Sequence, residues 1–220
     1  MLDRSLVALL FLLPATLSLP FTSRSDSSTL SFLSSAPFQS LIGLDDQTTH
    51  CSVDGLTVPL SGVPGLSVPG GQKLSTITVG RGVQNYTCTS GTYVTAGAVA
   101  NLFDLSCLFS GSKGRLDPTA ISSLLSKMAY SAIPYPLTGD LSVVIHHFFV
   151  DTPGKVASVN DPSRPSLNVP WLQLAGIDGQ GTLAKSVYRL DTVGGQPPDS
   201  CDKEGQDLSV QYAAMYYLTK

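Results

Sequence analysis

The residues best suited to chemistry in this sequence are polar and aromatic side chains inside stretches typical of β-strands. A polar group buried in a strand needs a hydrogen-bond partner, which is either another side chain or a ligand. One hypothesis is a ligand-binding face, with Trp171 and Tyr86 stacked on a sugar or phenolic ring. We favour the alternative, a structural network that fixes sheet register, in which Arg189 pairs with Asp191 or Asp104. The candidate ligand-binding residues are Arg81, Gln84, Tyr86, His147, Trp171 and Arg189, and Asn85 and Tyr188 have the same character.

No residue can be assigned a catalytic role from motifs. The sequence contains neither G-x-S-x-G, the usual hydrolase nucleophile motif, nor the zinc motif H-E-x-x-H. His146 and His147 are adjacent, so on a strand they point to opposite faces and cannot share a metal without a bulge. We therefore predict no metal site. The carboxylates lie mostly beside Gly, Pro or Ser, as turn residues do, but a glycosidase pair depends on spatial separation and stays open.

Residues 80–82 (Gly-Arg-Gly) look like the start of a dinucleotide-binding loop, but their context excludes that interpretation. The fingerprint needs a third glycine, where this chain has Asn85, and a helix after the loop. The next residues, 86–88 (Tyr-Thr-Cys), favour a strand instead. The two glycines are predicted to permit a β-bulge or a close approach of backbones within a strand.

Composition and the N-terminal residues indicate an exported protein. Only 13% of the 220 residues are charged and the net charge is −3, so there is no basic surface for nucleic acid or anionic membranes. Residues 6–13 form a short apolar run followed by small and polar residues, which is typical of a signal peptide cleaved near Ser18. No later stretch reaches the roughly 18 apolar residues of a membrane span. We expect secretion, and no membrane partner after cleavage.

Four cysteines, Cys51, Cys88, Cys107 and Cys201, predict two disulfides in an exported chain. Three pairings are possible. A hairpin folded about Gly97 would place Cys88 near Cys107 and leave Cys51 for Cys201, and we lean towards that pairing. Residues 85–87 (Asn-Tyr-Thr) form an N-glycosylation sequon, so Asn85 is either glycosylated or buried by its neighbours.

The chain divides into a signal peptide (1–18), a Ser/Thr-rich leader or flexible arm (19–50) and a single β domain (51–220). The predicted strands are 74–79, 84–88, 98–105, 141–150, 171–175, 184–191 and 208–218, separated by Gly/Pro-rich turns. Asp117 and Pro118 form a helix start, and four apolar residues at helical spacing follow, which predicts one helix near 118–129. The expected fold is all-β, a mostly antiparallel sandwich or barrel with that short helix.

Six segments together resemble a secreted, largely fungal family, domain of unknown function 3455, often labelled "malate dehydrogenase-like". They are GRGVQNYTC (80–88), GAVANLFDLSC (97–107), HHFFV (146–150), VPWLQL (169–174), VYRLDTVGGQPPDSC (187–201) and VQYAAMYY (210–217). The likeness runs from about Cys51 to the C-terminus. It departs mildly at Pro170, where the family usually has an acidic residue, and at Phe148, where it usually has Tyr. It implies a secreted, mostly β domain with its cysteines at family-like positions, and it supplies no catalytic residues.

The leading hypothesis is a non-catalytic secreted β domain that acts at the cell surface, wall or host interface. Its partner would be a cell-wall polysaccharide or an extracellular protein, and no cofactor is expected. The alternative is an extracellular hydrolase of carbohydrate or phenolic material whose residues assemble only in the fold. A convergent pocket with two carboxylates would favour the enzyme, and a closed, packed interior would favour the binding protein. The dehydrogenase label has no physical support in this sequence.

Overall fold

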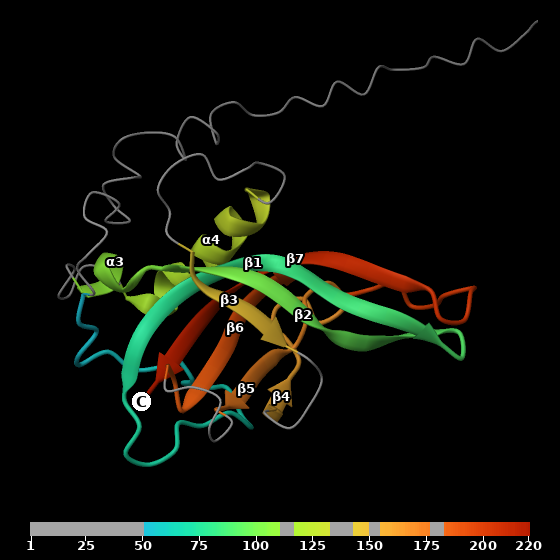
Figure 1. The fold of residues 1–220 in the computed structure, drawn as a ribbon. Helices are drawn as coiled ribbons and strands as arrows, with labels where there is room; N and C mark the ends of the chain where they lie inside the picture. The colour runs from blue at the N-terminus through green and yellow to red at the C-terminus, as the bar shows by residue number, and fades with distance from the viewer. Residues whose placement is uncertain (1–50, 111–116, 133–142, 150–154, 177–182) are drawn as a thin grey trace, which may run out of the picture.

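A computed structural model describes residues 51–110, 117–132, 143–149, 155–176 and 183–220, and for 143–149 it describes the backbone (Figure 1). The predicted signal peptide (1–18) and leader (19–50) lie outside these residues. Among the residues described, no helix is both long and apolar enough to cross a membrane.

The described part of the chain forms one seven-stranded antiparallel sheet in the order β3-β2-β1-β7-β6-β5-β4. The strands are β1 (Leu74–Thr89), β2 (Thr92–Asp104), β3 (Val143–Phe149), β4 (Lys155–Val159), β5 (Trp171–Ala175), β6 (Ser186–Gly194) and β7 (Asp207–Thr219). Two helices accompany them, α3 (Ser106–Ser110) and α4 (Pro118–Ser131). The predicted all-β fold with a helix near 118–129 is confirmed. The predicted strands 74–79 and 84–88 are one continuous strand, and α3 and β4 were not predicted.

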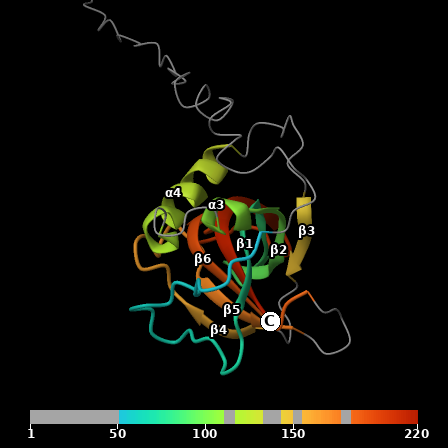
Figure 2. The same cartoon turned by 90° about the vertical axis from the view of Figure 1, so that its left-hand side faces the viewer.

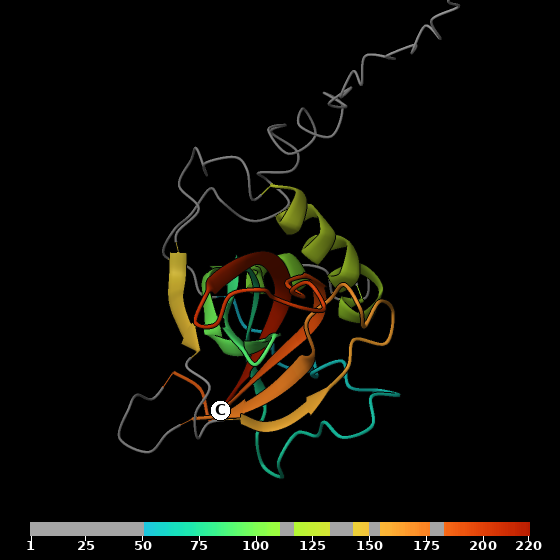
Figure 3. The same ribbon diagram turned by 90° about the vertical axis from the view of Figure 1, so that its right-hand side faces the viewer.

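The sheet curls into part of a barrel, so it has an inner and an outer face (Figure 3). The curl surrounds the inner face, and α4 lies outside it against β7, β6 and β1. The inner face carries a core of small, aliphatic and tyrosine side chains: Ala98, Ala100, Leu102, Val169, Tyr212, Ala214, Tyr216 and Leu218. The outer face carries the larger core, which α3, α4 and the segment 51–66 complete (Figure 2).

Gly80 and Gly82 allow β1 to curl against its neighbours. A Cβ on Gly82 would lie 1.9 Å from the carbonyl oxygen of Val99 in β2, and one on Gly80 would lie 2.5 Å from the ring of Tyr216 in β7. Only a residue without a Cβ fits such a close approach. The predicted close approach of backbones is confirmed. Every strand pair of the described sheet is antiparallel, so these glycines do not belong to a βαβ nucleotide-binding unit.

The hairpin between β1 and β2 turns at Ser90 and Gly91, which have φ angles of 52° and 78°. The predicted fold about Gly97 is wrong, because Gly97 lies within β2 opposite Asn85, beside a register shift in the pairing of the two strands. The β-bulge is therefore close to the Gly-Arg-Gly segment but not at its glycines.

The disulfides join Cys51 to Cys107 and Cys88 to Cys201, so the pairing we leaned towards is wrong. Because the hairpin turns at residues 90–91, Cys88 lies near its tip, whereas Cys107 follows the far end of β2. Cys201 reaches the tip through its backbone N–H, which donates to the carbonyl of Gly91. The predicted number of two disulfides is confirmed, and no described cysteine is free.

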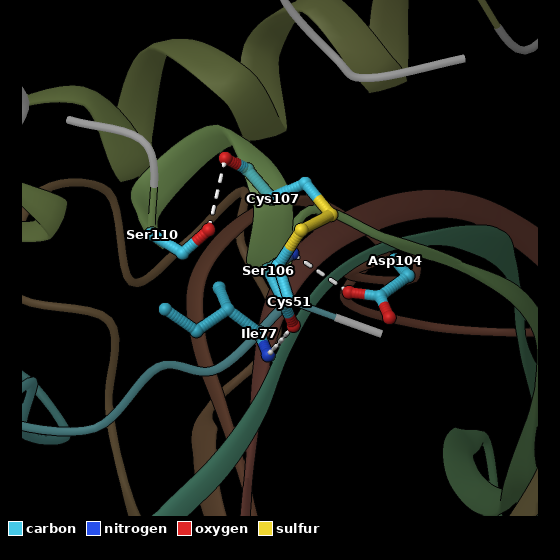
Figure 4. The surroundings of a disulfide bond; sticks show 6 residues. All are labelled: Cys51, Ile77, Asp104, Ser106, Cys107 and Ser110. Carbon is cyan, nitrogen blue, oxygen red and sulfur yellow. Dashed lines mark hydrogen bonds between the residues drawn. A yellow bond between two sulfur atoms is a disulfide. The ribbon is translucent and has the colours of Figure 1, made fainter. Parts of the chain in front are cut away.

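The Cys51–Cys107 disulfide ties the start of the described chain to α3 (Figure 4). Asp104 fixes the start of that helix, because its Oδ1 accepts from the N–H of Ser106 at 2.7 Å. The Ser106 hydroxyl oxygen in turn accepts from the N–H of Ile77 in β1 at 3.2 Å. The hydrogen bonds of residues 104–106 therefore hold the Cys51–Cys107 disulfide close to the core on the outer face of the sheet.

Helix α4 begins at its predicted cap, where Asp117 accepts from the N–H of Thr119 at 2.9 Å. Its fully buried positions are Pro118, Ser122 and Ser126, so small residues face the sheet. Of the apolar residues at helical spacing, Ile121 and Leu125 pack on the outer core, whereas Leu124 is 57% exposed. Small residues on the contact face let the helix lie close to β7, with which it makes its most extensive contact.

We predict that Gly82→Ala destabilises the fold by about 3 kcal/mol or more, because the new Cβ collides with a backbone carbonyl that cannot move without breaking the ladder. The measurement is the free energy of unfolding by denaturant titration. Gly70→Ala is the matched control, since a Cβ there meets nothing within 4 Å. Equal stability of the two variants would contradict this account of the curl.

Candidate functional site

Arg189 is the centre of a polar cluster on the inner face of the sheet. It lies in β6 opposite Tyr216 of β7 and is only 3% exposed. Its Nη1 donates to Oε1 of Gln84 at 3.2 Å, and its Nη2 donates to the carbonyl of Pro170 at 2.9 Å. The guanidinium carbon lies 5.4 Å from the centre of the Tyr212 ring. Gln84 is itself held in place, because its Nε2 donates to a backbone carbonyl of β2 at 2.7 Å.

Among the described residues, the groups that contact this buried cation are neutral, namely the side-chain amide of Gln84, a backbone carbonyl, Tyr212 and Tyr216. Its Nε has no hydrogen-bond partner in the described structure. Removing a charge from water costs several kcal/mol, which an opposite charge normally offsets. Neutral hydrogen-bond acceptors and an aromatic ring offset less of that cost than a carboxylate would. Among the described residues, Arg189 therefore has one N–H donor without an acceptor and no negative group that neutralises its charge.

The tyrosines around Arg189 do not supply the missing negative charge. Burial raises the pKa of Tyr86 to about 12, although the charge of Arg189 lowers it in part. Burial raises the pKa of Tyr216 well above its ordinary value, the neighbouring Tyr212 raises it further, and Arg189 opposes the rise only in part. The hydroxyls of Tyr212 and Tyr216 lie 2.7 Å apart, and the Tyr86 hydroxyl donates to the carbonyl of Gly195 at 2.7 Å. Tyr86 and Tyr216 therefore stay neutral at pH 7.

A second unsatisfied polar atom lies on the same face. Thr78 of β1 is opposite Tyr216, on the other side of β7 from Arg189. Its buried Oγ1 has no hydrogen-bond partner in the described structure. Tyr216 is thus flanked on both neighbouring strands by a buried polar atom that a ligand or an ordered water can satisfy.

Asp161 is the centre of a separate cluster on the outer face and is 2% exposed. One carboxylate oxygen accepts from the N–H and hydroxyl of Ser163 and the N–H of Arg164, at 2.6–2.8 Å. The other accepts from Nε1 of Trp171 at 2.9 Å and the hydroxyl of Thr192 at 3.3 Å. Burial acts to raise the pKa of Asp161, but these hydrogen bonds outweigh it and hold the pKa below its ordinary value. Both oxygens are occupied, so Asp161 organises this loop.

Asp191 combines a left-handed backbone conformation with a largely buried carboxyl group. Its φ of 49° is in the left-handed region, within a register shift of β6 between Leu190 and Val193. Such a conformation costs a non-glycine residue of the order of 1–3 kcal/mol. Burial raises the pKa of Asp191 to about 6, the negative charge of Asp161 adds to the effect, and Lys127 of α4 opposes it.

The predicted ion pair of Arg189 with Asp191 or Asp104 does not form. Residues 189 and 191 of a regular strand share a face, but the bulge places Asp191 among the charges of the outer face, Asp161 and Lys127. Asp104 lies three strands away from Arg189, at the end of β2, where its Oδ1 accepts from the N–H of Ser106 at the start of α3. The favoured hypothesis of a buried polar network therefore has the right type of cluster but the wrong partners.

Three of the six predicted binding residues come together, namely Gln84, Tyr86 and Arg189. Trp171 lies on the opposite face, since the next residue of β5, Leu172, is paired with Arg189 and the Trp171 indole donates to Asp161. Trp171 and Tyr86 therefore cannot stack on the same ring.

The other predicted residues are also dispersed. Arg81 lies on the outer face, where its Nη1 donates to the carbonyl of Ala132 at the end of α4. Tyr188 is buried in the outer core and donates to the carbonyl of Ser67 at 3.0 Å. The backbone of His147 pairs with Ala100 in the sheet, and its side chain lies outside the described structure.

Comparison with known proteins supports one assignment. Residues 69–220 match the family described as "Protein of unknown function (DUF3455)". The chain belongs to this family. The resemblance seen in the sequence is thereby confirmed over residues 69–220, whereas the predicted likeness began at about Cys51. No curated protein and no solved structure matched the chain.

In this DUF3455 member, sequence reasoning missed Tyr212 and Tyr216 as partners of Arg189. They occupy alternate positions of the C-terminal strand, so their common face was predictable. Whether they lie on the same face as Arg189 depends on the register between β6 and β7, which the sequence does not specify. Asp191 was missed because only the bulge distinguishes it from an ordinary strand residue.

We predict that Asp191→Asn stabilises the protein at pH 7 by about 1–2 kcal/mol, less than the full shift implies because the group is partly exposed. The raised pKa means that the folded state binds the proton of Asp191 more tightly than the unfolded state does. The contribution of Asp191 to the free energy of unfolding is therefore present at low pH and is lost as pH rises from about 4 to above 6. Asn resembles the protonated acid and tolerates positive φ. The check is unfolding free energy between pH 4 and pH 8.

Asp199→Asn is the matched control, because Asp199 is exposed. An Asp191→Asn variant with the same slope of stability against pH as the wild type would show that Asp191 does not cause the expected loss of stability as pH rises.

Proposed function

We propose that this protein is a secreted, non-catalytic binding domain that acts at the cell surface, wall or host interface. The inner face of its sheet takes a ligand that carries a carboxylate. The single observation that carries this proposal is Arg189, a buried guanidinium whose Nε has no partner, and whose acceptors are all neutral, among the residues that the structure describes.

The chemistry around Arg189 favours an anionic group attached to a ring. A carboxylate oxygen can accept from Nε and neutralise the charge, which a neutral ligand cannot do. Tyr212 presents an aromatic ring to the same guanidinium, and the paired hydroxyls of Tyr212 and Tyr216 can donate or accept. An acidic sugar or a phenolic acid satisfies both requirements. The tyrosines cover Arg189, so binding requires their side chains to move.

Two further features support an extracellular location. Both pairs of cysteines are oxidised, and structural disulfides are typical of proteins that pass through an oxidising compartment. The predicted signal peptide would direct the chain there. A cell-wall polysaccharide with uronic acid units is therefore the partner class that we propose.

The enzymatic alternative is less well supported by the carboxylates. Asp161 and Asp191 are close enough to influence each other's charge, as a hydrolase pair would be. Both oxygens of Asp161, however, already accept hydrogen bonds from several donors. Of this pair, Asp191 alone is left to transfer a proton, whereas a glycosidase needs two available carboxyl groups.

We predict that the wild type binds galacturonate and 4-hydroxybenzoate but not their neutral counterparts, galactose and phenol. Arg189→Met should weaken binding of the two acids at least about tenfold, because it removes the buried charge while keeping a side chain of similar length. Isothermal titration calorimetry measures each affinity. Hydrolysis is assayed separately with a galacturonate oligosaccharide and methyl 4-hydroxybenzoate, which contain the glycosidic and ester bonds that a hydrolase would cleave.

Arg81→Met is the matched control, since Arg81 is also partly buried but lies on the outer face. It should leave binding unchanged. Equal binding of acids to wild type and Arg189→Met, or no binding to the wild type, overturns the proposed site. Hydrolysis of the galacturonate oligosaccharide or of the methyl ester that is lost in Asp191→Asn would establish the enzymatic alternative instead.

A further inference from the structure

The described residues leave the outer face of the β1–β2 hairpin uncovered beyond the end of α4. In Figure 1 the tip of this hairpin extends away from both helices. Val94 and Val99 are 49% and 39% exposed, and their partners in β1 are Thr87 and Val83. Two exposed valines on one strand of a long hairpin are an unprotected apolar surface. We define this surface as the hairpin patch, made of Val83, Asn85, Thr87, Val94 and Val99.

Asn85 lies in the middle of the hairpin patch. Its neighbours across the ladder are Gly97 in β2 and Ser209 in β7, so neither side is blocked by a bulky side chain. Its Oδ1 accepts from the hydroxyl of Ser209 at 2.7 Å at an exposed position. This bond uses the amide oxygen and leaves Nδ2 without a partner in the described structure.

Residues 85–87 also have the sequence that oligosaccharide transfer requires, Asn-Tyr-Thr. The middle residue, Tyr86, is buried on the inner face, where its hydroxyl donates to the carbonyl of Gly195. Because side chains alternate along a strand, Asn85 and Thr87 lie together on the outer face, and both are partly exposed. The acceptor residue and the hydroxyl residue of the sequon are therefore on the solvent side of the sheet.

We propose that Asn85 carries an N-linked oligosaccharide that covers the hairpin patch. In the transfer step, a bond forms between Nδ2 of Asn85 and the anomeric carbon of a lipid-linked oligosaccharide diphosphate. The bond from that carbon to the phosphate oxygen breaks, the lipid diphosphate leaves, and Nδ2 loses one proton. The transfer precedes folding, because in the folded sheet both neighbours of β1 restrict access to the backbone of the sequon. This inference depends on the secretion that is part of the proposed function.

The test is to express the full chain in a eukaryotic secretory host and measure the intact mass before and after treatment with peptide N-glycosidase. We expect the secreted protein to lose the mass of one glycan, and peptide mapping in heavy-oxygen water to find the label at residue 85. Thr87→Ser keeps both the sequon and a hydroxyl for the bond to Asp207, so it should stay glycosylated, whereas Thr87→Ala should not.

A second measurement tests whether the glycan covers the hairpin patch. The unglycosylated variant Asn85→Gln should self-associate more than the glycosylated wild type in light scattering. Adding Val94→Thr and Val99→Thr to that variant should abolish the difference. Equal self-association of Asn85→Gln and the wild type would overturn the covering role.

The outcomes separate this inference from the proposed function. Secreted protein with an unmodified Asn85 overturns the glycan and leaves carboxylate binding at Arg189 standing. Protein that stays in the cell with reduced cysteines overturns both the glycan and the extracellular role.

Discussion

The close approach of β1 and β2 at Gly82, where a Cβ would lie 1.9 Å from the carbonyl oxygen of Val99, is the constraint on which the rest of the structure depends. Because the strands approach so closely, the inner side of the curl holds small residues, among them Ala98, Ala100 and Ala214. A face lined with small residues has room for a few large side chains from the neighbouring strands. Tyr212, Tyr216 and Arg189 occupy that room.

The two faces of the sheet consequently have different physical roles. The outer face holds most of the apolar core, both helices and the fully bonded Asp161, so it mainly supplies stability. Two unsatisfied polar atoms of the described structure, Nε of Arg189 and Oγ1 of Thr78, lie on the inner face beside Tyr216, and a third, Oγ of Ser126, lies on the buried side of α4 at the outer face. Buried polar groups without partners reduce stability, and the proposed ligand would satisfy the one at Arg189.

Much of the fold could be predicted from the sequence, but the pairing of distant residues could not. Alternating apolar residues predict an all-β chain, and Asp117 with Pro118 predicts the start of α4, because such features depend on neighbouring residues alone. The disulfide pairing depends on where the hairpin turns, and the partners of Arg189 depend on the bulge at Asp191. A shift of one residue in register reverses which side chains meet, and such a shift has no strong local signature.

The central claim is that the guanidinium of Arg189 is buried, has no negative partner among the described residues and can bind a carboxylate. The most direct measurement is the NMR signal of its Nε–H in nitrogen-15-labelled protein, assigned by its absence in Arg189→Lys. The account predicts a signal that exchanges slowly with water and shifts when galacturonate is added, but not when galactose is added. A signal that exchanges as fast as those of exposed arginines, or that is unchanged by saturating galacturonate, would contradict it.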